Sequence, residues 1–141
     1  MLSIPSILPH PEKAGTLPYF LYFIGAVSVF NTVQTYLSPD LKMTKKVYLK
    51  APIGQVSNLS ARTFGTWTIL TAVVRLYGAF YLQNAQIYEL CQCTFLVAFG
   101  HFFSEWLIYG TCKMDKGLLG PAIVSTVGST WMYLQKDYYT L

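Results

Sequence analysis

The chain has 141 residues, of which 53% are hydrophobic and only 11% are charged, whereas about 25% of the residues of a soluble domain are charged. The length suits one compact domain, and the composition argues against an ordinary soluble protein. The formal charge of +4 comes from the polar connections and forms no basic face with stacking aromatic rings, so we expect no nucleic acid among the partners.

Four apolar segments follow one another along the chain, and each is about long enough for a helix that crosses a bilayer, which takes roughly 17–25 residues. The expected spans are residues 17–37, 63–82, 87–109 and 118–134. The sequence therefore predicts an all-α fold, a polytopic membrane protein built as a bundle of four transmembrane helices over residues 17–135. An N-terminal segment, residues 1–16, lacks the apolar core of a cleavable signal peptide, and residues 136–141 form a C-terminal tail.

Three polar connections separate the predicted spans. The first, residues 38–62, is basic with interspersed apolar residues, which fits either a short interfacial helix on an anionic leaflet or a solvated loop. Ser60 is the expected N-cap of the second span. The second connection, residues 83–86, is so short that the second and third spans should form an antiparallel hairpin. The third, residues 110–117, reads as a polar turn.

The distribution of basic residues predicts the orientation in the membrane. Most of them lie in the first and third connections, namely Lys42, Lys45, Lys46, Lys50, Arg62, Lys113 and Lys116. The opposite side carries Lys13 and Lys136. By the positive-inside rule, the basic loops should be cytosolic and both termini lumenal. This orientation would leave the glycosylation sequon at Asn58 without a glycan.

Arg75 lies inside the second span, where an ionisable side chain is costly and normally faces a protein partner or a water-filled cavity. Counted from the hairpin turn at a rise of about 1.5 Å per residue, Arg75 is level with Thr94, and Glu89 is nearer the turn. We expect Arg75 to pair with Glu89, and Arg62 to pair with Glu105. The alternatives for Arg75 are snorkelling to the interface and contact with a partner protein or a ligand.

His101 and Glu105 are four residues apart in the third span and should share a helix face. We interpret them as hydrogen-bonded bundle residues, and an embedded catalytic pair as the weaker hypothesis. The sequence has no nucleotide-binding loop, nucleophile elbow or zinc-type cysteine spacing. No catalytic, metal-ligating or cofactor-binding residue is therefore assigned. In the fourth span, Ala122, Ser125 and Ser129 form the candidate helix-packing face, because small residues let helices approach closely.

Several stretches between residue 17 and the C-terminus carry a family resemblance. They are Phe30-Asn31-Thr32-Val33-Gln34-Thr35-Tyr36, Leu59-Ser60-Ala61-Arg62-Thr63-Phe64-Gly65-Thr66-Trp67-Thr68, Arg75-Leu76-Tyr77-Gly78-Ala79, His101-Phe102-Phe103-Ser104-Glu105, Tyr109-Gly110-Thr111, Gly120-Pro121, Trp131-Met132-Tyr133 and Asp137-Tyr138-Tyr139. With these stretches the chain resembles the ergosterol biosynthetic protein 28 family, in its fungal form.

The resemblance implies a non-catalytic scaffold of the endoplasmic reticulum membrane that needs no cofactor. Its implied partners are the sterol C-4 methyl oxidase, the 3β-hydroxysteroid dehydrogenase/decarboxylase and the 3-keto sterol reductase, with the sterol C-24 methyltransferase as a further candidate. Membrane lipids would surround it, and a homo-oligomer stays open. The alternative is a bundle that binds or transfers a sterol intermediate through Arg75, because arginine can hold the carboxylate of a 4-carboxysterol bidentately.

Overall fold

The computed structural model describes residue 9, residues 13–38 and residues 40–140. These residues form five helices and no strand: α1 (Leu17–Leu37), α2 (Lys42–Val47), α3 (Asn58–Phe80), α4 (Ala85–Leu107) and α5 (Lys116–Thr140). The prediction of an all-α fold is confirmed. Most of the predicted N-terminal segment, and the last residue of the predicted C-terminal tail, lie outside the described residues.

One helix of the described chain, α1, is long and apolar enough to cross a membrane by length and composition. The helices α3, α4 and α5 are at least as long as α1, but each of them carries charged side chains, whereas α1 has none. The bundle of four membrane-crossing helices therefore stays a prediction.

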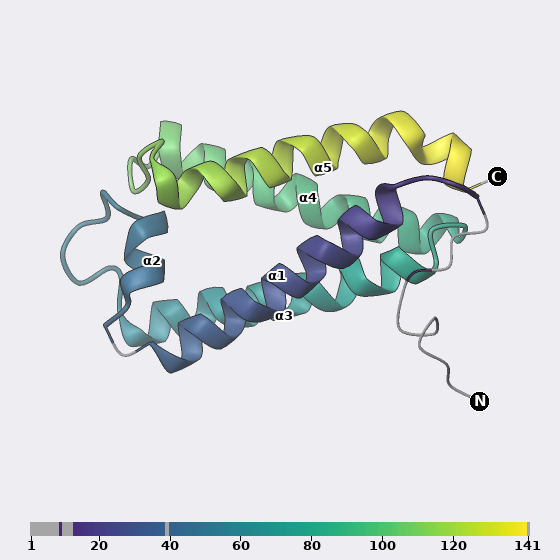
Figure 1. Ribbon diagram of the computed structural model, residues 1–141. Coiled ribbons are helices and arrows are strands. Elements are labelled where there is room, and N and C mark those ends of the chain that lie inside the picture. The colour runs from purple at the N-terminus through teal and green to yellow at the C-terminus, as the bar shows by residue number, and fades with distance from the viewer. Residues whose placement is uncertain (1–8, 10–12, 39, 141) are drawn as a thin grey trace.

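The four long helices are arranged as two pairs (Figure 1). The helix α1 lies along α3, and α4 lies along α5, while a short turn joins α3 to α4. Consecutive long helices run in opposite directions. The connections on either side of α2 and between α4 and α5 therefore lie at one end of the molecule, and the described parts near both termini lie at the other (Figure 1).

The α1–α3 pair is held together by close backbone approach and by hydrogen bonds between the helices. A Cβ atom on Gly65 would lie 2.0 Å from Thr35 Oγ1, so only glycine leaves room at this contact. Thr32 Oγ1 donates to the Gly65 carbonyl at 2.9 Å and lies 2.8 Å from Thr68 Oγ1. Small residues and hydroxyls of this kind are typical of helix interfaces inside membranes.

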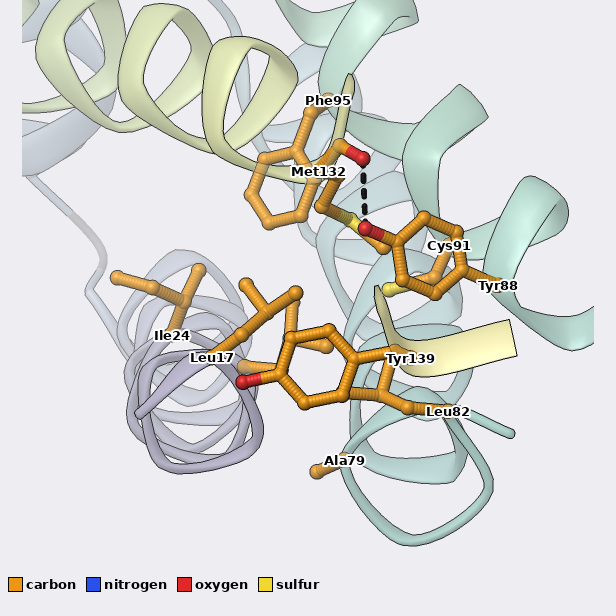
Figure 2. Close-up of a cluster of buried hydrophobic side chains, with 10 residues drawn as sticks. Leu17, Ile24, Ala79, Leu82, Tyr88, Cys91, Phe95, Met132 and Tyr139 are labelled. Atoms are coloured by element: carbon orange, nitrogen blue, oxygen red, sulfur yellow. Dashed lines mark hydrogen bonds between the residues drawn. The ribbon is translucent and has the colours of Figure 1, made fainter. Parts of the chain in front are cut away.

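The helices enclose two apolar clusters, one toward each end of the molecule. Figure 2 shows the cluster nearer the termini, where side chains of α1, α3, α4 and α5 meet around Phe95 and Met132. Tyr88 is fully buried there and its hydroxyl donates to the Met132 carbonyl at 2.6 Å, so this polar atom has a partner. The second cluster includes Phe64, Phe102 and Leu118 and lies nearer α2.

The helix α3 begins earlier than the second predicted span, and Ser57 is its N-cap. Ser57 Oγ accepts from the Ser60 amide at 3.2 Å, and Ser60 Oγ accepts from the Ser57 amide at 2.8 Å. The prediction of Ser60 as the N-cap is therefore wrong. Two serines three residues apart satisfy each other's amides as a capping box, and this places the helix start at the first of them.

The basic connection contains a short helix, α2, rather than only a loop. This helix packs against α5, where a Cβ atom on Gly117 would lie 2.1 Å from the Lys46 carbonyl oxygen. Because α5 starts at Lys116, Pro121 falls in its second turn and offers no amide to the Gly117 carbonyl. The fourth predicted span began at residue 118, so α5 starts two residues earlier than expected.

Candidate functional site

Arg75 projects from α3 into the bundle, where its side chain is only 6% exposed. Its Nε donates to Thr94 Oγ1 at 3.1 Å, and its two terminal nitrogens donate to the Thr94 carbonyl at 3.5 Å and to Ser28 Oγ at 3.4 Å. The guanidinium also lies over the ring of Phe95, 4.2 Å from its centroid, at the distance of a cation–π contact. Hairpin geometry placed Arg75 level with Thr94, and the structure confirms this register.

The predicted pair of Arg75 with Glu89 is wrong. Glu89 Oε1 instead accepts a hydrogen bond from Lys136 Nζ at 2.8 Å, and both side chains are substantially exposed. The helix α5 runs on to Thr140, beyond the end of the fourth predicted span, and this extra length brings Lys136 beside Glu89. Arg75 reaches inward to Ser28 and Thr94 instead of toward the end of α3, which also contradicts the snorkelling alternative.

The predicted pair of Arg62 with Glu105 is also wrong. Glu105 Oε1 accepts from the hydroxyl of Thr111 at 2.8 Å, in the connection that follows α4. Arg62 is exposed on α3, and it makes no salt bridge to an acidic residue within the described chain. The backbone turn after α4 lets Glu105 bond its own connection, because the Thr111 and Cys112 amides also donate to the Glu105 carbonyl.

A cavity of about 320 Å³ lies between the helices, with Arg75 in its wall. Residues from all five helices line it, and most of them are apolar. The lining residues include Val27, Ser28, Thr71, Val47, Phe64 and Phe102. The volume lies at the lower end of the range of about 300–1,000 Å³ for small-molecule sites. The arrangement is an apolar space with one buried cation.

His101 belongs to a different group of side chains, near α2. Its Nε2 lies 2.7 Å from the hydroxyl of Tyr48, and the ring of Trp67 packs edge-on against it with the centroids 5.1 Å apart. A second cavity of about 310 Å³ borders His101 and Glu105. Each of the two residues therefore has its own hydrogen-bond partner. Sequence reasoning missed Tyr48, because nothing local relates it to a histidine 53 positions away.

Burial gives Tyr48 an unusual ionisation. It follows α2, outside the predicted spans, and desolvation raises the pKa of its phenol above the ordinary value of 10.0. The phenol therefore stays protonated beyond neutral pH and keeps its hydrogen bond with His101.

Some of the small residues predicted to form a packing face on α5 are buried in the bundle. Ala122 and Ser125 are buried, whereas Ser129 is only partly so, and its buried Oγ has no hydrogen-bond partner among the described residues. The tightest contact is at Gly128, where a Cβ atom would lie 2.4 Å from Cδ1 of Phe95. Gly128 was not in the candidate packing face, although two three-residue steps, from Ala122 to Ser125 and on to Gly128, reach it.

Metal-ligating side chains are scattered over the fold. Within the part of the chain that the structure describes, no three of its His, Cys, Asp and Glu residues come together as a group that holds a metal ion. Cys91 and Cys112 are buried, and Cys93 is exposed.

Comparisons with known proteins point in one direction. A protein-family model described as "Erg28 like protein" matches residues 17–130. Ergosterol biosynthetic protein 28 of Candida albicans is 63% identical over 95% of this chain and 94% of its own length. The protein of the same name in Saccharomyces cerevisiae is 52% identical, covering 89% and 84% of the two chains, and the human homologue is 36% identical, covering 88% and 87%. No solved structure matches.

Proposed function

The chain belongs to the Erg28 family, which takes part in ergosterol biosynthesis, and we propose that it is a multi-pass scaffold of the endoplasmic reticulum membrane. In this proposal it tethers the enzymes of sterol C-4 demethylation: the C-4 methyl oxidase, the 3β-hydroxysteroid dehydrogenase/decarboxylase and the 3-keto sterol reductase. The sterol C-24 methyltransferase is a further proposed partner. The scaffold itself carries out no step of the chemistry.

The observation that carries the proposal is the exposure of large apolar side chains on all four long helices. Examples are Phe23 on α1, Leu70 on α3, Val97 on α4 and Leu134 on α5, each between 59% and 72% exposed. In water such surfaces mark interaction sites or cause aggregation. In a bilayer they contact lipid tails and the transmembrane helices of other proteins, which is what a membrane scaffold requires.

The polar side chains of α3 to α5 do not argue against membrane crossing, because most of the hydroxyls bond within their own helix. Thr63 donates to the Leu59 carbonyl and Thr66 to the Arg62 carbonyl, both at 2.9 Å. Thr94 and Thr126 do the same on α4 and α5. A hydroxyl that already has an acceptor costs less in a hydrocarbon environment. A count of polar residues therefore underestimates how well these helices fit into a bilayer.

The charge distribution supports the proposed orientation. The fold gathers α2, the connections around it and the connection between α4 and α5 at one end (Figure 1). Most of the basic residues lie in these parts or in the adjoining ends of α3 and α5. The described residues at the other end include Lys13 and Lys136, of which Lys136 is paired with Glu89. We therefore propose that the α2 end faces the cytosol and the other end the lumen.

Tethering has a physical benefit when successive enzymes share apolar intermediates. Such intermediates partition into the bilayer, and holding the next enzyme nearby raises its effective concentration around the product. No new contact with the intermediate is needed for this effect.

The test is affinity purification of the tagged full-length chain from endoplasmic reticulum membranes in a mild detergent. The three C-4 demethylation enzymes should be recovered together, and a tagged multi-pass protein of similar size and unrelated family should recover none. Cells that lack the chain should accumulate C-4-methylated sterols. Recovery of none of the three enzymes, or turnover of a C-4-methylated sterol by the purified chain alone, would overturn the proposal.

A further inference from the structure

We propose that the cavity between the helices is a binding site for an apolar molecule that carries a single carboxylate, and that Arg75 holds this carboxylate. The inference concerns a ligand of this chain and does not rest on the tethering of enzymes. It is carried by the buried arginine, by its incomplete set of partners, and by the cavity on which it opens.

Arg75 has more hydrogen-bonding capacity than its neighbours use. A guanidinium has five N–H donors and is always charged, whereas Arg75 makes three hydrogen bonds, two of them long at 3.4 and 3.5 Å. All three acceptors are neutral oxygens, on Ser28 and Thr94. A buried charge without a counter-ion is costly. An anion in the cavity would supply both the missing charge and the missing acceptors.

The chain's own carboxylates in this region are engaged elsewhere. Glu89 pairs with Lys136 near the surface, and Glu105 accepts from Thr111. Within the described residues no acidic side chain lies within salt-bridge distance of Arg75. The counter-ion is therefore expected to come from a bound molecule.

The cavity wall defines the rest of the ligand. Toward α2 it is lined by apolar side chains such as Val47, Phe64 and Phe102, which suit a hydrocarbon body. Ser28 and Thr71 add two hydroxyls to the lining, and Ser28 Oγ lies 3.4 Å from Arg75. The polar end of a ligand would therefore lie at Arg75, with its apolar body directed toward α2.

The charge at the site favours a carboxylate over a phosphate. Arg75 is the only cation among the cavity-lining residues that is buried, since Lys46 is exposed on α2. One buried positive charge balances one carboxylate, whereas a phosphate monoester carries about −1.5 to −2. Phe95 covers one face of the guanidinium, which leaves its in-plane N–H groups for bidentate contact with a planar carboxylate.

The first test compares acids with alcohols of the same skeleton, using purified full-length protein in detergent. The probes are oleate against oleyl alcohol, and 3β-hydroxy-5-cholenoic acid against 5-cholene-3β,24-diol. At least one acid should bind about 10- to 100-fold more tightly than its alcohol, as expected for charge-assisted hydrogen bonds. Selectivity for the steroid acid or for oleate identifies the source of the carboxylate. Equal affinity for acid and alcohol in both pairs would overturn the proposal.

The second test assigns that preference to Arg75. The variant Arg75→Gln should lose the preference of the acid over the alcohol, while Arg62→Gln should keep it, because Arg62 is on the same helix but exposed and outside the cavity wall. An unchanged preference in Arg75→Gln would contradict the assignment.

A third pair of variants tests the cavity without touching the charge. Gly120 lines the cavity, and a Cβ atom on Gly120 would meet no atom within 4 Å. A Cβ atom on Gly100 would also meet no atom within 4 Å, but Gly100 does not line the cavity. Gly120→Leu should weaken binding of the preferred acid at least 10-fold, whereas Gly100→Leu should leave it unchanged. Equal binding by these two variants would show that the ligand lies elsewhere. This comparison remains decisive if Arg75→Gln does not fold.

Discussion

The guanidinium of Arg75 rests on the ring of Phe95, and that ring in turn fills the space left by the missing side chain of Gly128. The carbon at the centre of the guanidinium is 4.2 Å from the ring centroid, and Phe95 is fully buried. A Cβ atom on Gly128 would lie 2.4 Å from Cδ1 of the same ring. A glycine on α5 thus determines where a cation on α3 can lie, through an aromatic ring on α4.

Replacing Gly128 should therefore destabilise the fold. Gly128→Ala places a methyl group against Phe95, and overpacking of this kind costs typically about 1–3 kcal/mol. Gly120→Ala on the same helix is the control, because its new Cβ meets no atom within 4 Å. Thermal unfolding in detergent should show a lower Tm for Gly128→Ala alone. Equal Tm values for the two variants would contradict the packing described around Phe95.

The hydrogen bonds between α1 and α3 should contribute measurably to the free energy of unfolding. Thr32→Val keeps the shape of the side chain but loses the bonds to the Gly65 carbonyl and to Thr68. Such interhelical bonds in membrane proteins contribute on average about 0.6 kcal/mol. The measurement is the free energy of unfolding in mixed micelles. Thr63→Val is the control, since Thr63 bonds only its own helix, and it should be close to neutral.

The ion pair of Glu89 and Lys136 should contribute little to stability. The two side chains are 54% and 38% exposed, and exposed pairs contribute about 0–1 kcal/mol. Glu89→Gln should therefore leave Tm almost unchanged, and Lys136→Gln should do the same. A fall in Tm of several degrees for Glu89→Gln alone would restore the rejected pairing of Glu89 with Arg75.

The raised pKa of Tyr48 predicts how stability depends on pH. Below about pH 10 the phenol is protonated in the folded and the unfolded chain, so its contribution is complete there. Above that pH the unfolded chain ionises first, and stability should fall by about 1.4 kcal/mol per pH unit for this one group. Tyr48→Phe removes this part of the alkaline loss. The difference in Tm between wild type and Tyr48→Phe, measured from pH 8 to pH 11, should change only above pH 10.

Cysteine labelling in sealed microsomes tests the proposed membrane crossing. In a chain whose own cysteines are replaced by serine, Lys45→Cys should react with a membrane-impermeant maleimide added outside, on the cytosolic face. Gln83→Cys, in the turn between α3 and α4, should react only after permeabilisation. Both positions are exposed in the fold. Reaction of both without permeabilisation would place the two ends on the same side and contradict the four-span topology.

Local patterns in the sequence were sufficient for the helices and for the hairpin register. The bounds of α1 coincide with the first expected span, because the segment holds no charged residue and proline marks its start. The equal depth of Arg75 and Thr94 followed from a short turn and a fixed rise per residue. Both results depend on neighbouring parts of the chain.

Contacts between helices distant in sequence were not predictable in the same way. The partner of Glu89 lies on α5, 47 positions away, and no rule of spacing selects it. A carboxylate seemed the natural partner for Arg75, yet the structure surrounds it with hydroxyls, a carbonyl and an aromatic ring. The partner of His101 was missed for the same reason, since Tyr48 reaches it from the connection after α2.

The tight contact between α2 and α5 couples the position of the basic connection to the shape of the cavity. The Lys46 carbonyl lies where a side chain on residue 117 would be, so α2 is seated on the start of α5 and is not free to move alone. Met43, Lys46 and Val47 also form part of the cavity wall. A partner protein or lipid headgroup that binds the lysines of α2 and displaces this helix would therefore also displace that part of the wall. The width of the cavity then depends on what binds at this end of the bundle.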